Sequence, residues 1–306
     1  MTRAQRKTFS GVIAPVVTPF DAATGDVAAE AFRGNLHAHF DRGASGVLLC
    51  GSTGEAALLD EGERDTLVEW ARPLVAPDRW LLAGVGGEST RQTIARAKRA
   101  AERGADAVLV VAPHYYGNAM TPEALGIHYR AVADASPAPV LLYNIPKYMH
   151  FALDPSLVRE LAAHQNIVGI KDSSGDLDLL RGYLAARGDA FAVLTGNGGT
   201  FLSALELGAD GGILAVSLLA GELSVAVWRA FAAGDRARAT ALQQRLTPLS
   251  NEIVGGMGVP GVKAAMDQAG GGLTGGAPRP PLIPARPAQI QRIAALLEAA
   301  GAARAA

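Results

Sequence analysis

The sequence predicts a (β/α)8 barrel, a TIM barrel, with a C-terminal helical extension, and three observations support it. Eight short apolar runs recur along the chain, with helix-forming segments between them. The runs are continuously apolar rather than alternating, which is typical of parallel strands buried on both faces. After the eighth run, the rest of the chain has helical periodicity only.

The expected strands are rich in Val, Ile, Leu and Ala, and each ends at Gly, Pro or a polar residue. They are residues 11–20, 46–51, 80–86, 107–113, 140–146, 167–173, 191–197 and 211–216. A doubly wound open sheet is the alternative topology. It would normally carry a glycine-rich phosphate fingerprint after the first strand, and residues 15–21 supply none.

Residues that typically begin or end helices lie between these runs. Ser89 or Thr90 caps 91–103, and Gly104 ends it. A proline stands at the first turn of two further helices, expected at 124–135 and 156–164. A further helix is expected at 27–42, and a glycine follows it.

The chain beyond the eighth strand reads as helices near 217–233, 235–249, 259–269 and 287–300, with a proline-rich connector at 278–287. No linker isolates a domain. We therefore expect residues 1–216 to hold the barrel strands and most of its helices. Residues 217–306 then hold the last barrel helix and the extension packed on the barrel.

Composition and charge limit the possible partners. The 28 basic and 29 acidic residues nearly cancel, which argues against nucleic acid and against a polybasic membrane surface. No stretch reaches the roughly 18 apolar residues of a membrane span. The single cysteine, Cys50, excludes an intrachain disulfide framework, and the polar segment 1–10 is unlike a secretory signal. We expect a cytoplasmic protein.

Chemistry in such barrels lies at the carboxyl ends of the strands. There the sequence places hydroxyls, one amine and small turns. These ends are Thr18-Pro19-Phe20, Gly51-Ser52-Thr53-Gly54-Glu55, Pro113-His114-Tyr115-Tyr116, Tyr143-Asn144-Ile145-Pro146, Lys171-Asp172-Ser173 and Gly196-Asn197-Gly198-Gly199.

Lys171 is the most informative of these residues. It is one of only five lysines, and it alone closes an apolar strand. A lysine at the barrel mouth is partly desolvated, which favours the neutral amine that a Schiff-base nucleophile needs. The alternative is a structural lysine that is ion-paired with Asp172 or Glu55.

The turn 51–54 combines small residues, whose amides can converge on an anion, with the hydroxyls of Ser52 and Thr53. It could bind a carboxylate or phosphate, or simply form a tight turn. The phenols Tyr143 and Tyr115 could relay a proton or stand at a rim or interface.

Two other site types compete with this one. The glycines at 196–199 and 208–212 resemble the phosphate loops of many barrels, so a phosphosugar or flavin barrel is a second hypothesis. Close helix–strand packing explains the same glycines. A metal site is disfavoured, because His37 and His39 are two residues apart and no HExxH or CxxC spacing occurs.

Together and in this order, the strand ends resemble the dihydrodipicolinate synthase/N-acetylneuraminate lyase superfamily of pyruvate-dependent class I aldolases. The likeness runs from Gly11 to about Leu297. It rests on Gly51-Ser52-Thr53-Gly54-Glu55, Pro113-His114-Tyr115-Tyr116, Tyr143-Asn144-Ile145-Pro146, Gly169-Ile170-Lys171-Asp172 and Gly208-Ala209-Asp210-Gly211-Gly212-Ile213.

The resemblance implies a role for each of these residues. Lys171 would condense with the keto carbon of pyruvate, and Tyr143, assisted by Ser52, would shuttle protons. Ser52 and Thr53 would hold the pyruvate carboxylate. Tyr115 would reach into a neighbouring subunit's site. The backbone carbonyl of Ile213 would lie beside the lysine.

The resemblance also implies a homotetramer, a dimer of dimers, with no metal or organic cofactor. A catalytically inactive binding protein is a third hypothesis, which the intact Lys171, Tyr143 and Thr53 disfavour. Gly196 and Tyr148 complete the expected substrate site.

One departure from the resemblance bears on the second substrate. Dihydrodipicolinate synthases carry an arginine where this chain has Tyr148, with Lys147 beside it. The first choice is therefore a 4-hydroxy-2-oxoglutarate or related 2-keto acid aldolase. The alternatives are 4-hydroxy-tetrahydrodipicolinate synthase and a 2-keto-3-deoxy sugar acid aldolase or dehydratase. For a sugar acid, Tyr148, Asn197 and Ser217 would bind hydroxyls.

Overall fold

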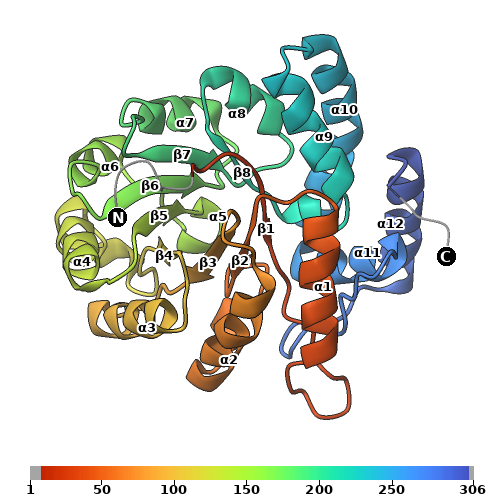
Figure 1. The fold of residues 1–306 in the computed structure, drawn as a ribbon, viewed down its shortest axis with the longest axis horizontal. Helices are drawn as coiled ribbons and strands as arrows, with labels where there is room; N and C mark the ends of the chain where they lie inside the picture. The colour runs from red at the N-terminus through yellow and green to blue at the C-terminus, as the bar shows by residue number, and fades with distance from the viewer. Residues whose placement is uncertain (1–7, 303–306) are drawn as a thin grey trace.

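Eight parallel strands close into a barrel in the computed structural model, which describes residues 8–302 (Figure 1). Each strand pairs with the next, and β8 pairs with β1, so the predicted topology is confirmed. The strands are β1 Gly11–Pro15, β2 Gly46–Leu49, β3 Trp80–Gly84, β4 Ala107–Val111, β5 Val140–Asn144, β6 Ile167–Asp172, β7 Ala192–Thr195 and β8 Gly211–Ile213.

The strands are shorter than the apolar runs that predicted them. After β1, for example, Val16 still donates its amide to the Leu48 carbonyl of β2 and, like Val17, remains buried, although both lie outside the strand. Val85 after β3 and Ala112 after β4 also remain buried outside their strands. Burial therefore continues into the loops at the carboxyl end of the barrel.

Helices surround the barrel, and several begin at the residues that the sequence indicated. Ser89 accepts a hydrogen bond from the Gln92 amide, and Pro122 and Pro155 each stand at a first helical position. The helices are α1 Ala29–Asp41, α2 Glu61–Ala71, α3 Thr90–Glu102, α4 Pro122–Ala135, α5 Pro146–Met149, α6 Pro155–Leu161, α7 Leu177–Leu184 and α8 Phe201–Leu207.

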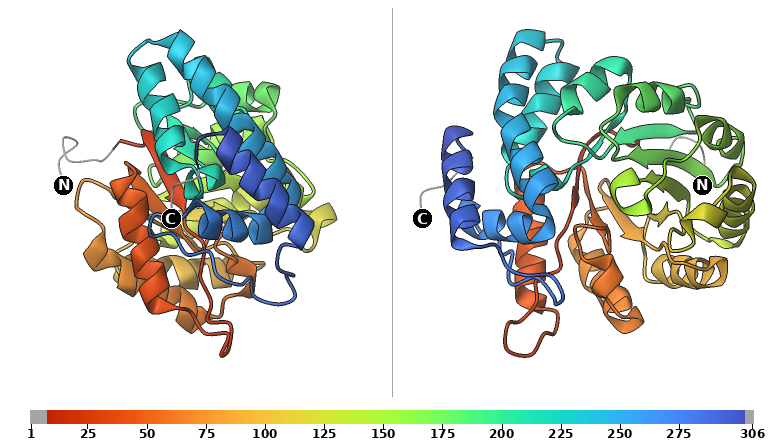
Figure 2. Two further views of the ribbon diagram at one scale, coloured as in Figure 1. Left: turned by 90° about the vertical axis from the view of Figure 1, so that its right-hand side faces the viewer. Right: turned by 180° about the vertical axis from the view of Figure 1, so that it is seen from behind.

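The chain after β8 forms helices that pack on one side of the barrel, beyond α1 (Figures 1 and 2). They are η5 Ala215–Leu218, α9 Gly221–Ala232, α10 Arg236–Pro248, the π-helix η6 Leu249–Met257, α11 Gly258–Ala269 and α12 Pro287–Ala299. The helix expected at 217–233 is thus a 3-10 turn followed by α9.

The π-helix was not predicted. Pro248 lacks a backbone donor inside the helical pattern, and the chain continues from it in wider turns.

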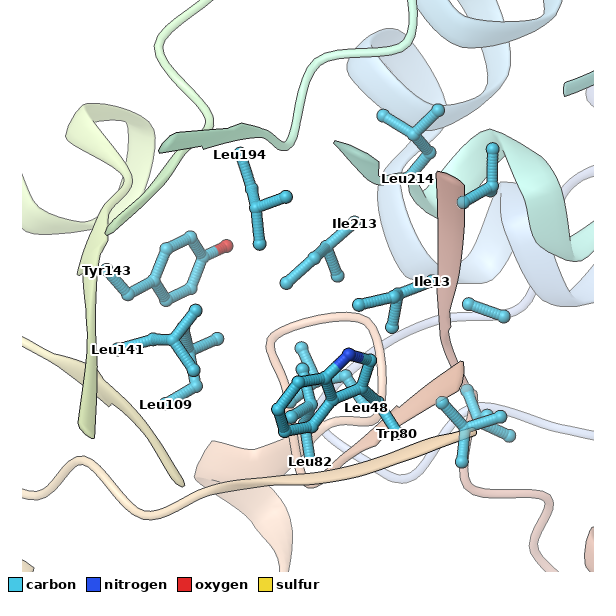
Figure 3. Close-up of a cluster of buried hydrophobic side chains, with 14 of the residues drawn as sticks. Ile13, Leu48, Trp80, Leu82, Leu109, Leu141, Tyr143, Leu194, Ile213 and Leu214 are labelled. Atoms are coloured by element: carbon cyan, nitrogen blue, oxygen red, sulfur yellow. The ribbon is translucent and has the colours of Figure 1, made fainter. Parts of the chain in front are cut away.

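Side chains from the strands fill the barrel interior. Figure 3 shows Leu109, Leu141, Leu194 and Ile213 in this cluster, with Tyr143 among them. In that view the Tyr143 hydroxyl and the Trp80 indole nitrogen are polar atoms within an otherwise apolar cluster.

Residues 8–302 include no helix that is both long and apolar enough to cross a membrane. Most of the polar segment 1–10 lies outside the described residues.

His39 is buried inside the helical layer. It lies on α1 with 1% of its surface exposed, and its Nε2 has no hydrogen-bond partner among the described residues. Burial lowers the pKa of His39 from 6.5 to about 3, and the neighbouring Arg42 charge acts in the same direction. The native state therefore holds this imidazole neutral.

This burial makes stability depend on pH. Because the folded pKa lies below the unfolded one, the unfolded chain takes up the proton first as the pH falls. The contribution is intact above pH 6.5 and is lost progressively toward pH 3. By pH 5, we expect about 2 kcal/mol less free energy of unfolding from this group.

Denaturant titrations between pH 7 and pH 5 measure this loss. The His39→Leu variant should show a correspondingly flatter profile. His37→Leu, on the exposed side of the same helix, is the matched control and should keep the wild-type profile. Equal profiles for His39→Leu and the wild type would contradict the prediction.

Candidate active site

A cavity of about 440 Å³ opens at the carboxyl ends of the strands. It brings together seven of the eight predicted site residues, from β2, β5, β6, β7 and β8 or the loops that follow them. They are Ser52, Thr53, Tyr143, Tyr148, Lys171, Gly196 and Ile213. Tyr115 is not among the residues that line it.

Lys171 and Tyr143 form the centre of this cavity. They are partners in the β5–β6 register, so their side chains lie on the same face of the sheet. The Lys171 ammonium lies 4.3 Å from the centroid of the Tyr143 ring. Both residues are buried, at 5% and 4% exposure. An amine and a phenol therefore meet at the base of the pocket.

The alternative of a structurally ion-paired Lys171 does not match the observed contacts. Glu55 pairs with Lys263, at 2.5 Å. Asp172 accepts hydrogen bonds from Asn144 and Ser174. Within residues 8–302, no carboxylate lies within ion-pairing distance of the Lys171 amine.

Asp172 and Asn144 support the strand ends from the opposite face. The Asn144 Nδ2 donates to Asp172 Oδ1 at 2.7 Å, and the Asn144 side-chain oxygen accepts from the Leu153 amide at 2.9 Å. Burial raises the pKa of Asp172, and the hydrogen bonds from Asn144 and Ser174 oppose that shift. These contacts fix β5 and β6 in the register that places Tyr143 beside Lys171.

The loop after β2 folds back over the pocket. Thr18 Oγ1 donates to the Gly54 carbonyl at 2.7 Å, and a side chain at Gly54 would lie only 2.9 Å from the Val16 carbonyl. This close packing leaves Ser52 and Thr53 facing the cavity. The Ser52 and Tyr143 hydroxyls are 3.5 Å apart, so they form the two ends of a possible proton path.

Gly196 packs closely against Ser173 and the stem of Lys171. A Cβ at this position would lie 1.9 Å from Ser173 Oγ and 2.9 Å from Lys171 Cε. The following glycines are also tightly packed, since a Cβ at Gly198 would lie 2.5 Å from Val216 Cγ1. These contacts favour the packing explanation of the glycines over a phosphate loop.

The mouth of the cavity carries Lys147 and Tyr148. The Lys147 amine donates to the Gly255 carbonyl of η6 at 2.9 Å. Tyr148 is 42% exposed, and partial burial raises its pKa, with Tyr143 acting in the same direction. The exposed Lys147 thus places a cation at the entrance, one residue before Tyr148.

The π-helix supplies lining residues that sequence reasoning missed. Ser250, Asn251, Val254 and Gly255 face the cavity from η6. The proline at 248 and the adjacent glycines at 255 and 256 were the available signals, because both disturb a regular helix.

Two expected residues lie elsewhere. Tyr115 is 78% exposed in the loop after β4, where its ring packs edge-on against Tyr116. Ser217 is buried, donates to the Leu214 carbonyl at 2.7 Å and is not among the residues that line the cavity, so its contact with a substrate hydroxyl stays a prediction. Asn197 does line the cavity, and its side-chain oxygen accepts from the Gly199 amide.

In the described part of the chain, no group of three or more His, Cys, Asp or Glu side chains is arranged to hold a metal ion. The polar side chains that line the cavity carry hydroxyls, amides and two amines.

Comparison with known proteins identifies the family. The model of the dihydrodipicolinate synthetase family matches residues 8–300. A relative from Exiguobacterium sp., named 4-hydroxy-tetrahydrodipicolinate synthase, is 35% identical over 276 residues, which is 90% of this chain and 92% of the relative.

Solved structures of the same family superpose closely. A dihydrodipicolinate synthase from Bacillus anthracis has a TM-score of 0.90 at 29% identity and covers 96% of this chain and 99% of its own. The same figures hold for YagE, a prophage protein of the family from E. coli K12, solved in complex with pyruvate.

The family match spans nearly every described residue, and the barrel and its helical extension agree with the solved structures. The resemblance inferred from the strand ends is thereby confirmed, and so is the expectation of a lyase. The chain belongs to the dihydrodipicolinate synthetase family.

Proposed function

We propose that this protein catalyses a class I aldol reaction of pyruvate, with Lys171 as the Schiff-base residue. The observation that carries the proposal is the buried Lys171 amine, which faces Tyr143 at a strand end and has no carboxylate partner within residues 8–302. The pyruvate in the solved YagE complex supports the choice of substrate.

The chemistry begins at the keto carbon. The neutral Lys171 amine attacks C2 of pyruvate to give a carbinolamine, which loses water to form an imine. Loss of a C3 proton then gives an enamine, the carbon nucleophile that attacks an aldehyde. Tyr143, with Ser52 3.5 Å away, is placed to carry the protons between these intermediates and solvent.

The pyruvate carboxylate needs hydrogen-bond donors beside the lysine. Ser52 and Thr53 bring hydroxyls and backbone amides to this side of the cavity. Ile213, the last residue of β8, also lines the cavity. Gly196 keeps room for the lysine stem.

The name of the Exiguobacterium relative favours 4-hydroxy-tetrahydrodipicolinate synthase, which was the alternative rather than the first choice of the sequence analysis. That reaction joins pyruvate to aspartate semialdehyde, whose distal carboxylate needs a cation. Tyr148 supplies none. Lys147, at the cavity mouth, provides one. We therefore place the synthase reaction first.

A second candidate is cleavage of 4-hydroxy-2-oxoglutarate. A specific observation favours it, because Tyr148 stands where synthases of the family carry an arginine, so the cation is a single-point amine rather than a bidentate guanidinium. A neutral 2-keto-3-deoxy sugar acid would use Tyr148 and Asn197 instead.

Tyr115 belongs to the proposal through a neighbouring subunit. Its exposure and its edge-on contact with Tyr116 suit a side chain that is covered by another copy of the chain. The shared site, the tetramer and the cytoplasmic location stay predictions.

Borohydride trapping tests the Schiff base directly. Reduction in the presence of pyruvate should attach one reduced pyruvate per chain, and peptide mapping should locate it on Lys171. Lys171→Ala should lose both label and activity, whereas Lys98→Ala, at an exposed helical lysine, should keep both. A Lys171→Ala protein with wild-type turnover would refute the proposal.

Removing the Tyr143 hydroxyl tests the proton path. Tyr143→Phe should lower kcat by about 10²–10⁴-fold, the usual value of one positioned acid–base group, with a much smaller change in KM. Tyr129→Phe is the control, because that buried hydroxyl has no partner among the described residues. A decrease below about threefold would make Tyr143 a wall residue instead.

Removing the charge at the mouth identifies the acceptor. Lys147→Met should lower kcat/KM for aspartate semialdehyde by about 10- to 100-fold, the value of a charged hydrogen bond, and leave pyruvate trapping unchanged. Tyr148→Phe should affect a 2-keto-3-deoxy sugar acid more. The wild-type ratio of aspartate semialdehyde condensation to 4-hydroxy-2-oxoglutarate cleavage decides between the first two candidates. Equal loss on all substrates would contradict a role in acceptor choice.

A further inference from the structure

A second buried lysine lies outside the chemistry described above. The Lys263 amine on α11 pairs with Glu55 at 2.5 Å, and both side chains are 1% exposed. The amine also donates to the Ala277 carbonyl at 2.9 Å. The other Glu55 oxygen accepts from the Arg279 amide at 2.8 Å. The pair thus ties the loop after β2 to the C-terminal extension.

Stability alone does not account for this pair. Desolvating two charges costs as much as their attraction returns, and apolar replacements of such pairs are often neutral or stabilising. What a buried pair can supply is a single defined geometry. Here it acts on Glu55, whose backbone lies in the left-handed region at φ 58°. That conformation needs support from its surroundings.

The loop is held at several further points from the same side. Arg279 donates to the Leu58 carbonyl at 2.9 Å and forms an ion pair with Glu63. The Arg279 guanidinium and the Lys263 amine both lie over the Phe20 ring, at 4.0 and 4.5 Å from its centroid. The C-terminal extension therefore contacts both Glu55 and the first turn of α2.

Glu55 stands two residues after Thr53 in the same turn. The Cys50 backbone at the other end of this turn is also left-handed, at φ 51°. A turn with both ends in that region has little freedom to move its central residues separately. Fixing Glu55 therefore fixes where the Ser52 and Thr53 hydroxyls face the cavity.

We propose that Glu55 and Lys263 are positioning residues, through which the C-terminal extension holds Ser52 and Thr53 in the geometry that binds the pyruvate carboxylate. This inference rests on the proposed function, since it assigns the carboxylate to those hydroxyls. Neither Glu55 nor Lys263 is among the residues that line the cavity around Lys171. They act through the turn between them and the cavity.

The test measures the pyruvate concentration that gives half-maximal labelling by borohydride trapping. This assay needs no acceptor aldehyde. Glu55→Gln and Lys263→Met should raise it by about 10²-fold, the effect of roughly 1 Å of misplacement. Maximal trapping at saturating pyruvate should persist, because Lys171 is intact. Thermal melting shows that each variant is folded at the assay temperature.

The double variant Glu55→Gln/Lys263→Met keeps the test decisive if a single variant does not fold. It leaves no unpaired charge, so it should melt near the wild-type temperature and still need more pyruvate. The control is Asn35→Leu. Asn35 exchanges two hydrogen bonds with Thr274, so this change loosens the same extension without touching the loop.

The outcomes separate the two proposals. If the wild type traps no pyruvate, the proposed function fails. If the wild type traps pyruvate and the folded double variant has the wild-type half-saturation, the positioning role is refuted. An equal rise in Asn35→Leu also refutes it, because any loosening of the extension would then suffice. A rise confined to the Glu55 and Lys263 variants supports it.

Discussion

The register between β5 and β6 is the constraint on which the site depends. It pairs Tyr143 with Lys171, so the amine and the phenol share one face and one level of the barrel. Their neighbours Asn144 and Asp172 are paired in the same register and hydrogen-bond on the opposite face. A slip of either strand by one residue would turn that strand's side chain, Tyr143 or Lys171, away from the cavity. The hydrogen bond between Asn144 and Asp172 on one face of the sheet therefore stabilises the register that places Tyr143 beside Lys171 on the other.

Much of this architecture could be predicted because it is local in the sequence. Continuous apolar runs identify the strands, and parallel strands place their carboxyl ends together, which is how Lys171, Tyr143 and Ser52 could be grouped in advance. The contacts that could not be predicted join distant segments. The Glu55 carboxylate could be matched with any lysine, and only the fold shows that its partner is Lys263 rather than Lys171.

The side of the cavity proposed to bind the second substrate was harder to predict for a different reason. Its wall comes from α5 and the π-helix η6, whose path departs from regular periodicity. The orientation of Lys147 depends on a carbonyl of η6, more than a hundred positions away in the chain. Residue type alone could show that Tyr148 is not an arginine, but not where the neighbouring amine would lie.

These two sides suggest a division within the barrel. The side proposed to bind pyruvate is built from strand ends, and close contacts such as that of Gly196 with the lysine stem leave little room for change. The acceptor side is built from segments that are partly exposed, such as Tyr148 and Lys147. Loops tolerate substitution better than strand ends do. On the proposed function, the same Lys171 chemistry can therefore serve different aldehydes, while the Lys263–Glu55 pair ties the C-terminal extension to the loop that carries Ser52 and Thr53.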